Sequence, residues 1–209
     1  RNPATSLTAL RGLKGRAQPF VAEQIPSVLG NPVAYVIVTN ETLRPQFERL
    51  AKWKTESGVP AVVRTMEFIR QQYPAGADDA ERVRSFIRDA YSRWGTKWVL
   101  LGGDTDVIPE RLAFNVSFYQ LEHIAADIYY SCLDGSWNSD GDNRWGEPTD
   151  GDDGGEVDLL GEVFVGRAPV DTVGETATWV AKTVRYEIDG TPHAGEAQFL
   201  AEYLGYYAP

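Results

Sequence analysis

Short runs of apolar, β-branched residues recur along the chain and are separated by longer amphipathic stretches. Residues 34–39 read Ala-Tyr-Val-Ile-Val-Thr, and comparable runs lie at 59–66, 97–103 and 162–167. Runs of this length without strict alternation are typical of strands that are covered on both faces. The pattern therefore predicts strands at these four places.

Between these runs, apolar residues recur at helical spacing. Each such stretch has a polar residue that can cap its first turn, and the first two end at a glycine. We predict three helices: from Asn40 or Thr42 to Ser57, ended by Gly58; from Asp78 or Asp79 to Trp94, ended by Gly95; and residues 172–187, opened by a capping box between Thr172 and Glu175.

The centre of the chain and its two ends are less regular. Residues 113–120 and 128–133 are predicted to be strands, as a hairpin or an edge pair, and residues 198–203 begin one more strand. Residues 1–32 carry Pro, Gly, Ser and Thr with little periodicity, which is typical of an arm or linker. We therefore expect an arm at 1–32 and one domain at 33–209.

The alternation of strands and helices implies a mostly parallel sheet with helices on both faces, a three-layer α/β/α fold. The chain has 209 residues, of which 43% are hydrophobic, enough for one sizeable core. No apolar run reaches about 18 residues, so we predict no membrane span. The chain opens on Arg1 without a signal peptide, and we expect a processed or cloned fragment whose targeting segment has been removed.

Negative charge is concentrated in one loop. The net charge is -10, and the segment from Asp134 to Glu162 holds ten acidic residues and one basic residue, a balance of -9. An acidic balance argues against nucleic acid as a partner, because phosphates would be repelled. The single cysteine excludes an intrachain disulfide and a zinc site with several thiolates.

The acidic loop carries oxygen-bearing side chains at every second position. Asn138, Asp140 and Asp142 supply side-chain oxygens, Arg144 supplies a backbone carbonyl, and Gly141 provides the bend. Calcium prefers six to eight oxygen ligands, and calcium loops use positions 1, 3, 5 and 7 in this way. The loop is therefore predicted to bind a hard cation, most simply calcium.

A further carboxylate must come from outside this short run. Glu147 is the first choice for it, with Asp158 and Asp134 next. The loop departs from the EF-hand pattern, which needs glycine at position 6 and glutamate at position 12. The alternative is a solvated turn, since Asp, Asn and Gly favour bends. A second ion held by Asp150, Asp152 and Asp153 is also open.

Other residues give weaker signals. Asp104 follows a predicted strand, where α/β sheets gather their sites, although a turn in which Asp104 bonds backbone amides is the better interpretation. Cys132 and His123 invite a nucleophile–base hypothesis, but no glycine-rich nucleophile turn surrounds them. A lone cysteine is usually a small buried hydrophobe. His193 falls in a predicted surface loop. We therefore assign no catalytic residue from these signals.

The order of several segments resembles the gingipain-like cysteine peptidases, peptidase family C25. The resemblance covers about residues 33–205. It rests on LAKWKTESGVP at 50–60, ERVRSFIRDAY at 81–91, KWVLLGGD at 97–104 with VIP at 107–109, DIYY at 127–130, EVFVGRAPV at 162–170 and RYE at 185–187. No single motif decides it, but their order and spacing are specific.

The resemblance implies the first of two subdomains of a caspase-like α/β/α catalytic domain. The family's catalytic His, in a Gly-His-Gly-type turn, and its Cys about thirty residues later match no residue of this chain. Residues 199–203 are similar to the strand that opens the second subdomain. If the catalytic dyad lies on a second, non-covalently bound chain, an apolar edge near residues 197–209 would be needed to contact it. Val36, Leu100 and Phe164 are expected to lie at the centre of the sheet.

The resulting expectation is the N-terminal portion of a secreted or cell-surface, calcium-binding cysteine endopeptidase. Its partners would be a protein or peptide substrate and the remaining catalytic subdomain, as a segment or as a separate chain after processing. The alternative is a non-catalytic calcium-binding α/β module of a surface or adhesion protein. A receiver-like or flavodoxin-like domain is disfavoured, because its acidic residues would lie at several strand ends.

Overall fold

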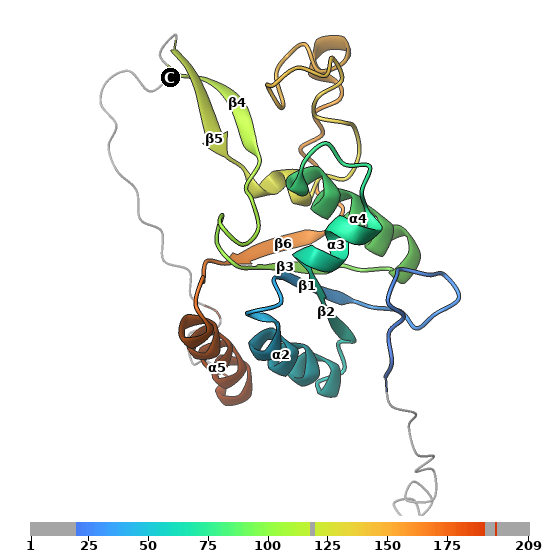
Figure 1. The fold of residues 1–209 in the computed structure, drawn as a ribbon, viewed down its shortest axis with the longest axis vertical. Helices are drawn as coiled ribbons and strands as arrows, with labels where there is room; N and C mark the ends of the chain where they lie inside the picture. Colours follow the sequence, from blue (N-terminus) through green and yellow to red (C-terminus); the bar gives the residue numbers. More distant parts are fainter. Residues whose placement is uncertain (1–19, 118–119, 191–194, 196–209) are drawn as a thin grey trace, which may run out of the picture.

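A four-stranded parallel sheet forms the centre of the molecule in the computed structural model, which describes residues 20–117, 120–190 and 195 (Figure 1). The strand order is β2-β1-β3-β6, and every neighbouring pair is parallel. The strands are β1 (Tyr35–Thr39), β2 (Ala61–Thr65), β3 (Trp98–Gly102) and β6 (Phe164–Ala168). The four strands predicted from the apolar runs are thus confirmed.

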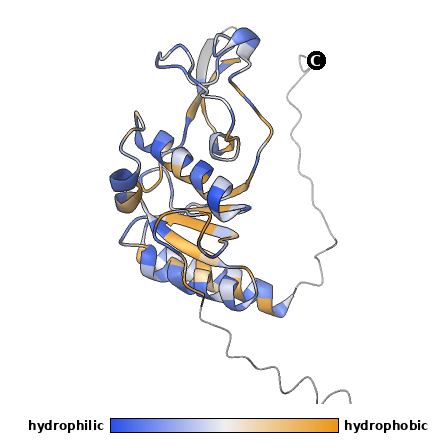
Figure 2. Ribbon diagram, turned by 90° about the vertical axis from the view of Figure 1, so that its right-hand side faces the viewer, coloured by the Kyte–Doolittle hydropathy of each residue, from blue (hydrophilic) through white to orange (hydrophobic). Residues whose placement is uncertain are grey.

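Helices cover both faces of this sheet. In Figure 1, α3 (Met66–Gln72) and α4 (Asp79–Trp94) lie on one face, and α2 (Arg44–Glu56) and α5 (Val173–Asp189) lie on the other. Figure 2 shows the apolar strands between helices whose outer faces are polar. The predicted three-layer α/β/α architecture is confirmed.

The helix boundaries follow local signals in the sequence. The Asp78 carboxylate accepts a hydrogen bond from the Glu81 amide at 2.8 Å, and Gly95 ends α4 with a left-handed φ of 70°. Thr172 and Glu175 form the predicted capping box of α5. The Asn40 side chain accepts from the Leu43 amide, as predicted for a cap, but helix α2 begins about one turn later. Pro45 has no N–H to donate to the carbonyl four residues before it, so the continuous series of helical bonds starts only after it.

Helix α3 was not predicted. The second strand, expected to run to Met66, ends at Thr65, whose hydroxyl accepts a hydrogen bond from the Phe68 amide at 3.3 Å. This contact caps a seven-residue helix that starts directly at Met66. Helix α3 follows the strand without a break, and its first apolar residue continues the apolar run of the strand. Periodicity therefore does not show where the strand ends and the short helix begins.

The hairpin differs from its prediction. Strands β4 (Leu112–Ser117) and β5 (Gln120–Ala125) pair antiparallel, so the predicted strand at 113–120 contributes to both. The sequence between them is Phe-Tyr and lacks the glycine or asparagine that marks a tight turn. The strand predicted at 128–133 is wrong: a 3-10 turn (Asp127–Tyr130) lies there instead. It buries Tyr129, Tyr130 and Cys132 against the core.

The expected centre of the sheet is confirmed for two residues and wrong for the third. Val36 and Leu100 are buried on β1 and β3, whereas Phe164 on β6 is 73% exposed. Within the part of the chain that the structure describes, β6 is the last strand of its sheet and pairs with β3 only. One apolar strand therefore has an open edge and an uncovered aromatic ring.

Part of the predicted arm contacts the domain. Phe20 and Ala22 pack against the core, and Val33 is fully buried. The boundary at residue 32 stays a prediction. The predicted strand at 198–203, the expected edge at 197–209 and His193 lie outside the described residues. Of the described helices, none is long and apolar enough to cross a membrane.

Candidate metal centre

The acidic loop, residues 134–162, is anchored at its start by Arg84 of α4. Arg84 is buried, with 3% of its surface exposed. Its guanidinium donates hydrogen bonds of 2.7 to 3.1 Å to the backbone carbonyls of Tyr129, Cys132, Asp134 and Gly135. Burial lowers the pKa of Arg84, and the carbonyl bonds together with the Tyr129 ring, 4.9 Å from the guanidinium, stabilise its charge. One helix side chain thereby fixes the path of the chain into the loop.

Aromatic rings form the floor of the loop. Trp137 and Trp145 each meet the ring of Tyr129 edge-on, at centroid distances of 5.6 and 5.9 Å. The Arg111 guanidinium lies 3.5 Å over the Trp145 ring and pairs with both Asp78 oxygens at 2.8 Å. The loop is therefore tied to the N-terminus of α4 as well as to its middle.

Asp150 organises the interior of the loop. It is fully buried, and its carboxylate accepts hydrogen bonds from the amides of Ser139, Gly146 and Glu147 at 2.7, 2.9 and 3.0 Å. Three amide donors stabilise a buried carboxylate without a cation. This role was not anticipated from the sequence, which does not distinguish Asp150 from its acidic neighbours.

Three of the predicted ligands converge on one point. One carboxylate oxygen each of Asp140, Asp142 and Glu147 lies within 4.8 Å of the others. The Asn138 amide donates to the Asp142 carbonyl at 2.9 Å, and its Oδ1 atom is buried without a hydrogen-bond partner among the described residues. Glu147, the first-choice outside carboxylate, is 7% exposed, and the Arg144 guanidinium lies 3.6 Å from it.

Two further predicted ligands belong to a second group. Asp134 and Asp158 lie with Glu162 rather than with Asp140, again with carboxylate oxygens within 4.8 Å of one another. Glu162 was not predicted; it also accepts a hydrogen bond from the Leu133 amide. Its only sequence signal is its place at the end of the loop, two residues before β6.

The donor set of the first group suits a hard cation. Three carboxylates converge in this group, and the buried, unpartnered amide oxygen of Asn138 belongs to the same loop. Calcium prefers oxygen ligands of these kinds to nitrogen or sulfur ligands. Among the described residues, the groups with this convergence do not include Asp150, Asp152 or Asp153. Both carboxylate oxygens of Asp150 accept hydrogen bonds from backbone amides. The geometry therefore does not support the alternative of a second ion held by Asp150, Asp152 and Asp153.

The family assignment comes from comparison with known proteins. The profile of peptidase family C25 matches residues 29–205. The chain belongs to peptidase family C25. This confirms the resemblance seen in the order of its segments. No curated protein matches the chain.

Solved structures show the same fold as this C25 chain. Latent dimeric PorU from Porphyromonas gingivalis has 24% identity and a TM-score of 0.55, covering 73% of this chain and 15% of PorU. A solved protease has 19% identity and a TM-score of 0.52, over 79% and 30% of the two chains. The complex of the pro- and mature domains of RgpB from P. gingivalis has 21% identity and a TM-score of 0.50, covering 73% of this chain and 29% of the RgpB chain. The C25 chain thus spans less than a third of each.

The weaker candidates, Asp104, Cys132 and His123, lie in surroundings typical of residues with a structural role. The Asp104 carboxylate accepts from the Asp106 amide at 3.1 Å, as in the predicted turn. Cys132 is fully buried, and burial raises the pKa of its thiol. His123 is exposed on β5, in the hairpin, and Cys132 follows the 3-10 turn in the core. Cys132 has the environment of a structural residue.

Gly135, in the acidic loop, is a position where a side chain is expected to destabilise the fold. It adopts a left-handed φ of 65°, and an added Cβ would lie 2.3 Å from the Glu156 carbonyl oxygen. We expect Gly135→Ala to destabilise the fold by at least about 2 kcal/mol in urea unfolding. Gly141→Ala is the control, because Gly141 has a similar φ of 74° but no atom within 4 Å of that Cβ. Equal losses for both variants would contradict the close packing at Gly135.

Proposed function

We propose that this chain is the N-terminal portion of a secreted or cell-surface, calcium-binding cysteine endopeptidase, whose His/Cys dyad lies in a following segment or chain. The observation that carries the proposal is the C25 match over residues 29–205. Two features support it: the α/β/α fold that the chain shares with solved relatives, and the buried thiol of Cys132. A nucleophilic cysteine needs access to substrate and a lowered pKa, and Cys132 has neither.

In the complete enzyme, a Cys thiolate assisted by His would attack the peptide carbonyl of a protein or peptide substrate and form an acyl-enzyme. This chain would supply half of the sheet and the acidic loop. The open edge of β6 and the exposed Phe164 suit contact with the remaining catalytic subdomain. Such contact would cover an apolar ring that is costly to leave in water.

Calcium would serve this chain as a structural ion. Asp140, Asp142, Glu147 and the amide oxygen of Asn138 would hold it, and the Arg144 carbonyl is the predicted fifth ligand. The bound ion would offset the mutual repulsion of these carboxylates. The predicted ligands Asp134 and Asp158 would remain with Glu162 as a separate acidic cluster.

The peptidase proposal is tested by sequence and by activity. The coding sequence beyond Pro209 should contain a Gly-His-Gly-type turn and a cysteine about thirty residues later. This chain alone should not cleave a mixed-sequence fluorogenic peptide library, whereas the protein extended through that cysteine should. Cys132→Ala in the extended protein should keep full activity. Absence of both motifs would favour the non-catalytic calcium-binding module instead.

A further inference from the structure

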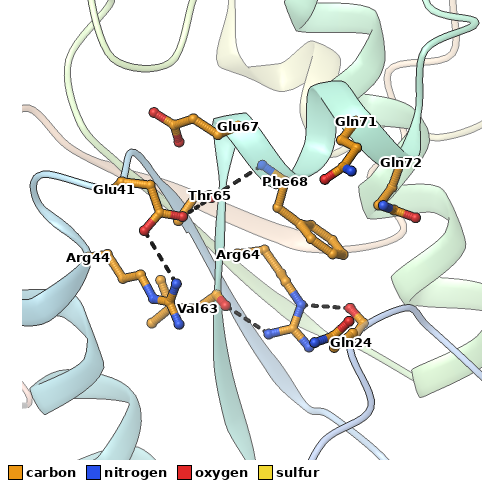
Figure 3. Close-up of a pocket in the computed structure, with 10 residues that line it drawn as sticks. All are labelled: Gln24, Glu41, Arg44, Val63, Arg64, Thr65, Glu67, Phe68, Gln71 and Gln72. Atoms are coloured by element: carbon orange, nitrogen blue, oxygen red, sulfur yellow. Dashed lines mark hydrogen bonds and ion pairs between the residues drawn. The ribbon is translucent and has the colours of Figure 1, made fainter.

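A polar cavity lies on the far side of the sheet from β6. It has a volume of about 520 Å³ and opens between the start of α2, the end of β2 and helix α3. Figure 3 shows the side chains of Glu41, Arg44 and Arg64 around its base and those of Glu67 and Gln71 at the α3 side. Carboxyl ends of parallel strands are where α/β proteins usually bind ligands.

Arg64 is the unusual residue of this cavity. Its guanidinium donates to the carbonyls of Gln24 and Val63, each at 2.8 Å, and to the Glu23 carbonyl. These acceptors are neutral, and among the described residues no ion pair involves Arg64. Arginine carries five N–H donors, so two remain after these three bonds. The side chain is held in place but has hydrogen-bonding capacity left.

The positive charge of Arg64 is stabilised by neutral groups, and among the described residues it has no carboxylate partner. The guanidinium lies over the rings of Phe68 and Trp94, 5.6 and 5.3 Å from their centroids. Burial, with a further contribution from Arg44, lowers the pKa of Arg64 to about 10. The other arginine of the cavity is different, because Arg44 already pairs with Glu41 at 3.3 Å and with Glu48 at 2.7 Å.

We propose that this cavity binds a single carboxylate group, with Arg64 as its charged partner. A carboxylate accepts two hydrogen bonds from one guanidinium, which matches the donors that Arg64 retains. Glu67 and Glu41 also line the cavity, so a ligand with several negative charges would be repelled. The amides of Gln24 and Gln71 suit a polar body without further negative charge next to the carboxylate. A free amino acid and the C-terminus of a peptide both present this chemistry.

Binding can be measured by titration calorimetry and by the change in tryptophan fluorescence, to which Trp94, whose ring lies beneath Arg64, contributes. The probes are glutamine, a neutral tetrapeptide with a free C-terminus, the same tetrapeptide with a C-terminal amide, and citrate. We expect saturable binding of glutamine or of the free tetrapeptide, at least about tenfold tighter than binding of the amide or citrate. Which of the two binds more tightly distinguishes a small-molecule site from a peptide site.

Three variants assign the binding to this cavity. Arg64→Gln should weaken it at least about tenfold, Glu67→Gln should strengthen it, and Gln71→Glu should weaken it by adding repulsion. Arg49→Gln, on the exposed side of α2, is the control and should change nothing. Because Arg64 also holds residues 23 and 24, Glu67→Gln and Gln71→Glu decide the outcome if Arg64→Gln does not fold. No saturable binding, or binding that ignores all three changes, would overturn the proposal.

Discussion

Arg84→Ala should lower the free energy of unfolding by about 4 kcal/mol, one of the largest losses expected for a single side chain here. The substitution removes a buried guanidinium and leaves the carbonyls of Tyr129, Cys132, Asp134 and Gly135 without their donor. The carbonyls of Tyr129 and Cys132 are buried, and each costs on the order of 1 to 3 kcal/mol when orphaned, whereas those of Asp134 and Gly135 are partly buried and add less. Urea unfolding monitored by far-UV circular dichroism measures the change.

Arg84→Lys should recover little of this loss, because an ammonium group does not reach four carbonyls in a planar fork. Arg88→Ala is the matched control: Arg88 lies one turn further along α4 and is exposed. Its removal should cost less than about 0.5 kcal/mol. A loss for Arg84→Ala as small as that for Arg88→Ala would show that the loop is not anchored through this residue.

Calcium should raise the melting temperature by roughly 10 °C at a free concentration about a thousandfold above its Kd, and chelator should reverse the rise. The reason is that an ion that binds only the folded loop stabilises it by mass action. Asp140→Ala combined with Asp142→Ala removes two of the three converging carboxylates and should abolish the calcium response. Differential scanning calorimetry with calcium and with chelator measures both effects.

The matched control for the calcium prediction is Asp152→Ala combined with Asp153→Ala. These residues are exposed in the same loop, carry the same charge and do not join the converging group. This variant should keep the full calcium response. If both double variants lose it equally, the effect is general screening of the loop's charge; if chelator leaves the melt of the unaltered protein unchanged, the loop is a charged turn.

The sheet and its larger helices could be predicted because their signals are local. The β-branched run at 34–39 and the capping box at Thr172 each specify one element without help from distant residues. Phe164 shows the limit of that reasoning. Its run has the composition of a buried strand, but burial depends on what lies beside β6, and strand composition does not contain that information.

The candidate metal site was partly predictable for a similar reason. The every-second-residue spacing of Asn138, Asp140 and Asp142 is a local pattern, and Glu147 is close enough in sequence to join it. Asp158 is farther away in sequence and Asp134 is as near as Glu147, but the loop's path takes both to Glu162 instead. That path depends on Arg84, which lies fifty residues before the start of the loop.

The contacts of Arg84 with backbone carbonyls and those of Asp150 with backbone amides share one property. In both, a charged side chain bonds backbone atoms, and backbone atoms are the same for every residue type. Sequence patterns therefore carry no signal for such contacts. Arg64 is a further example, since its guanidinium donates to the backbone carbonyls of Glu23, Gln24 and Val63.

We propose that this C25 chain contributes to a cysteine peptidase without supplying its nucleophile. The most direct test extends the protein through its following coding sequence and treats it with a peptidyl acyloxymethyl ketone, which alkylates the catalytic cysteine of this class of enzyme. Peptide mass mapping should place the adduct outside residues 1–209 and leave Cys132 unmodified. An adduct on Cys132, with activity lost in Cys132→Ala, would contradict the account.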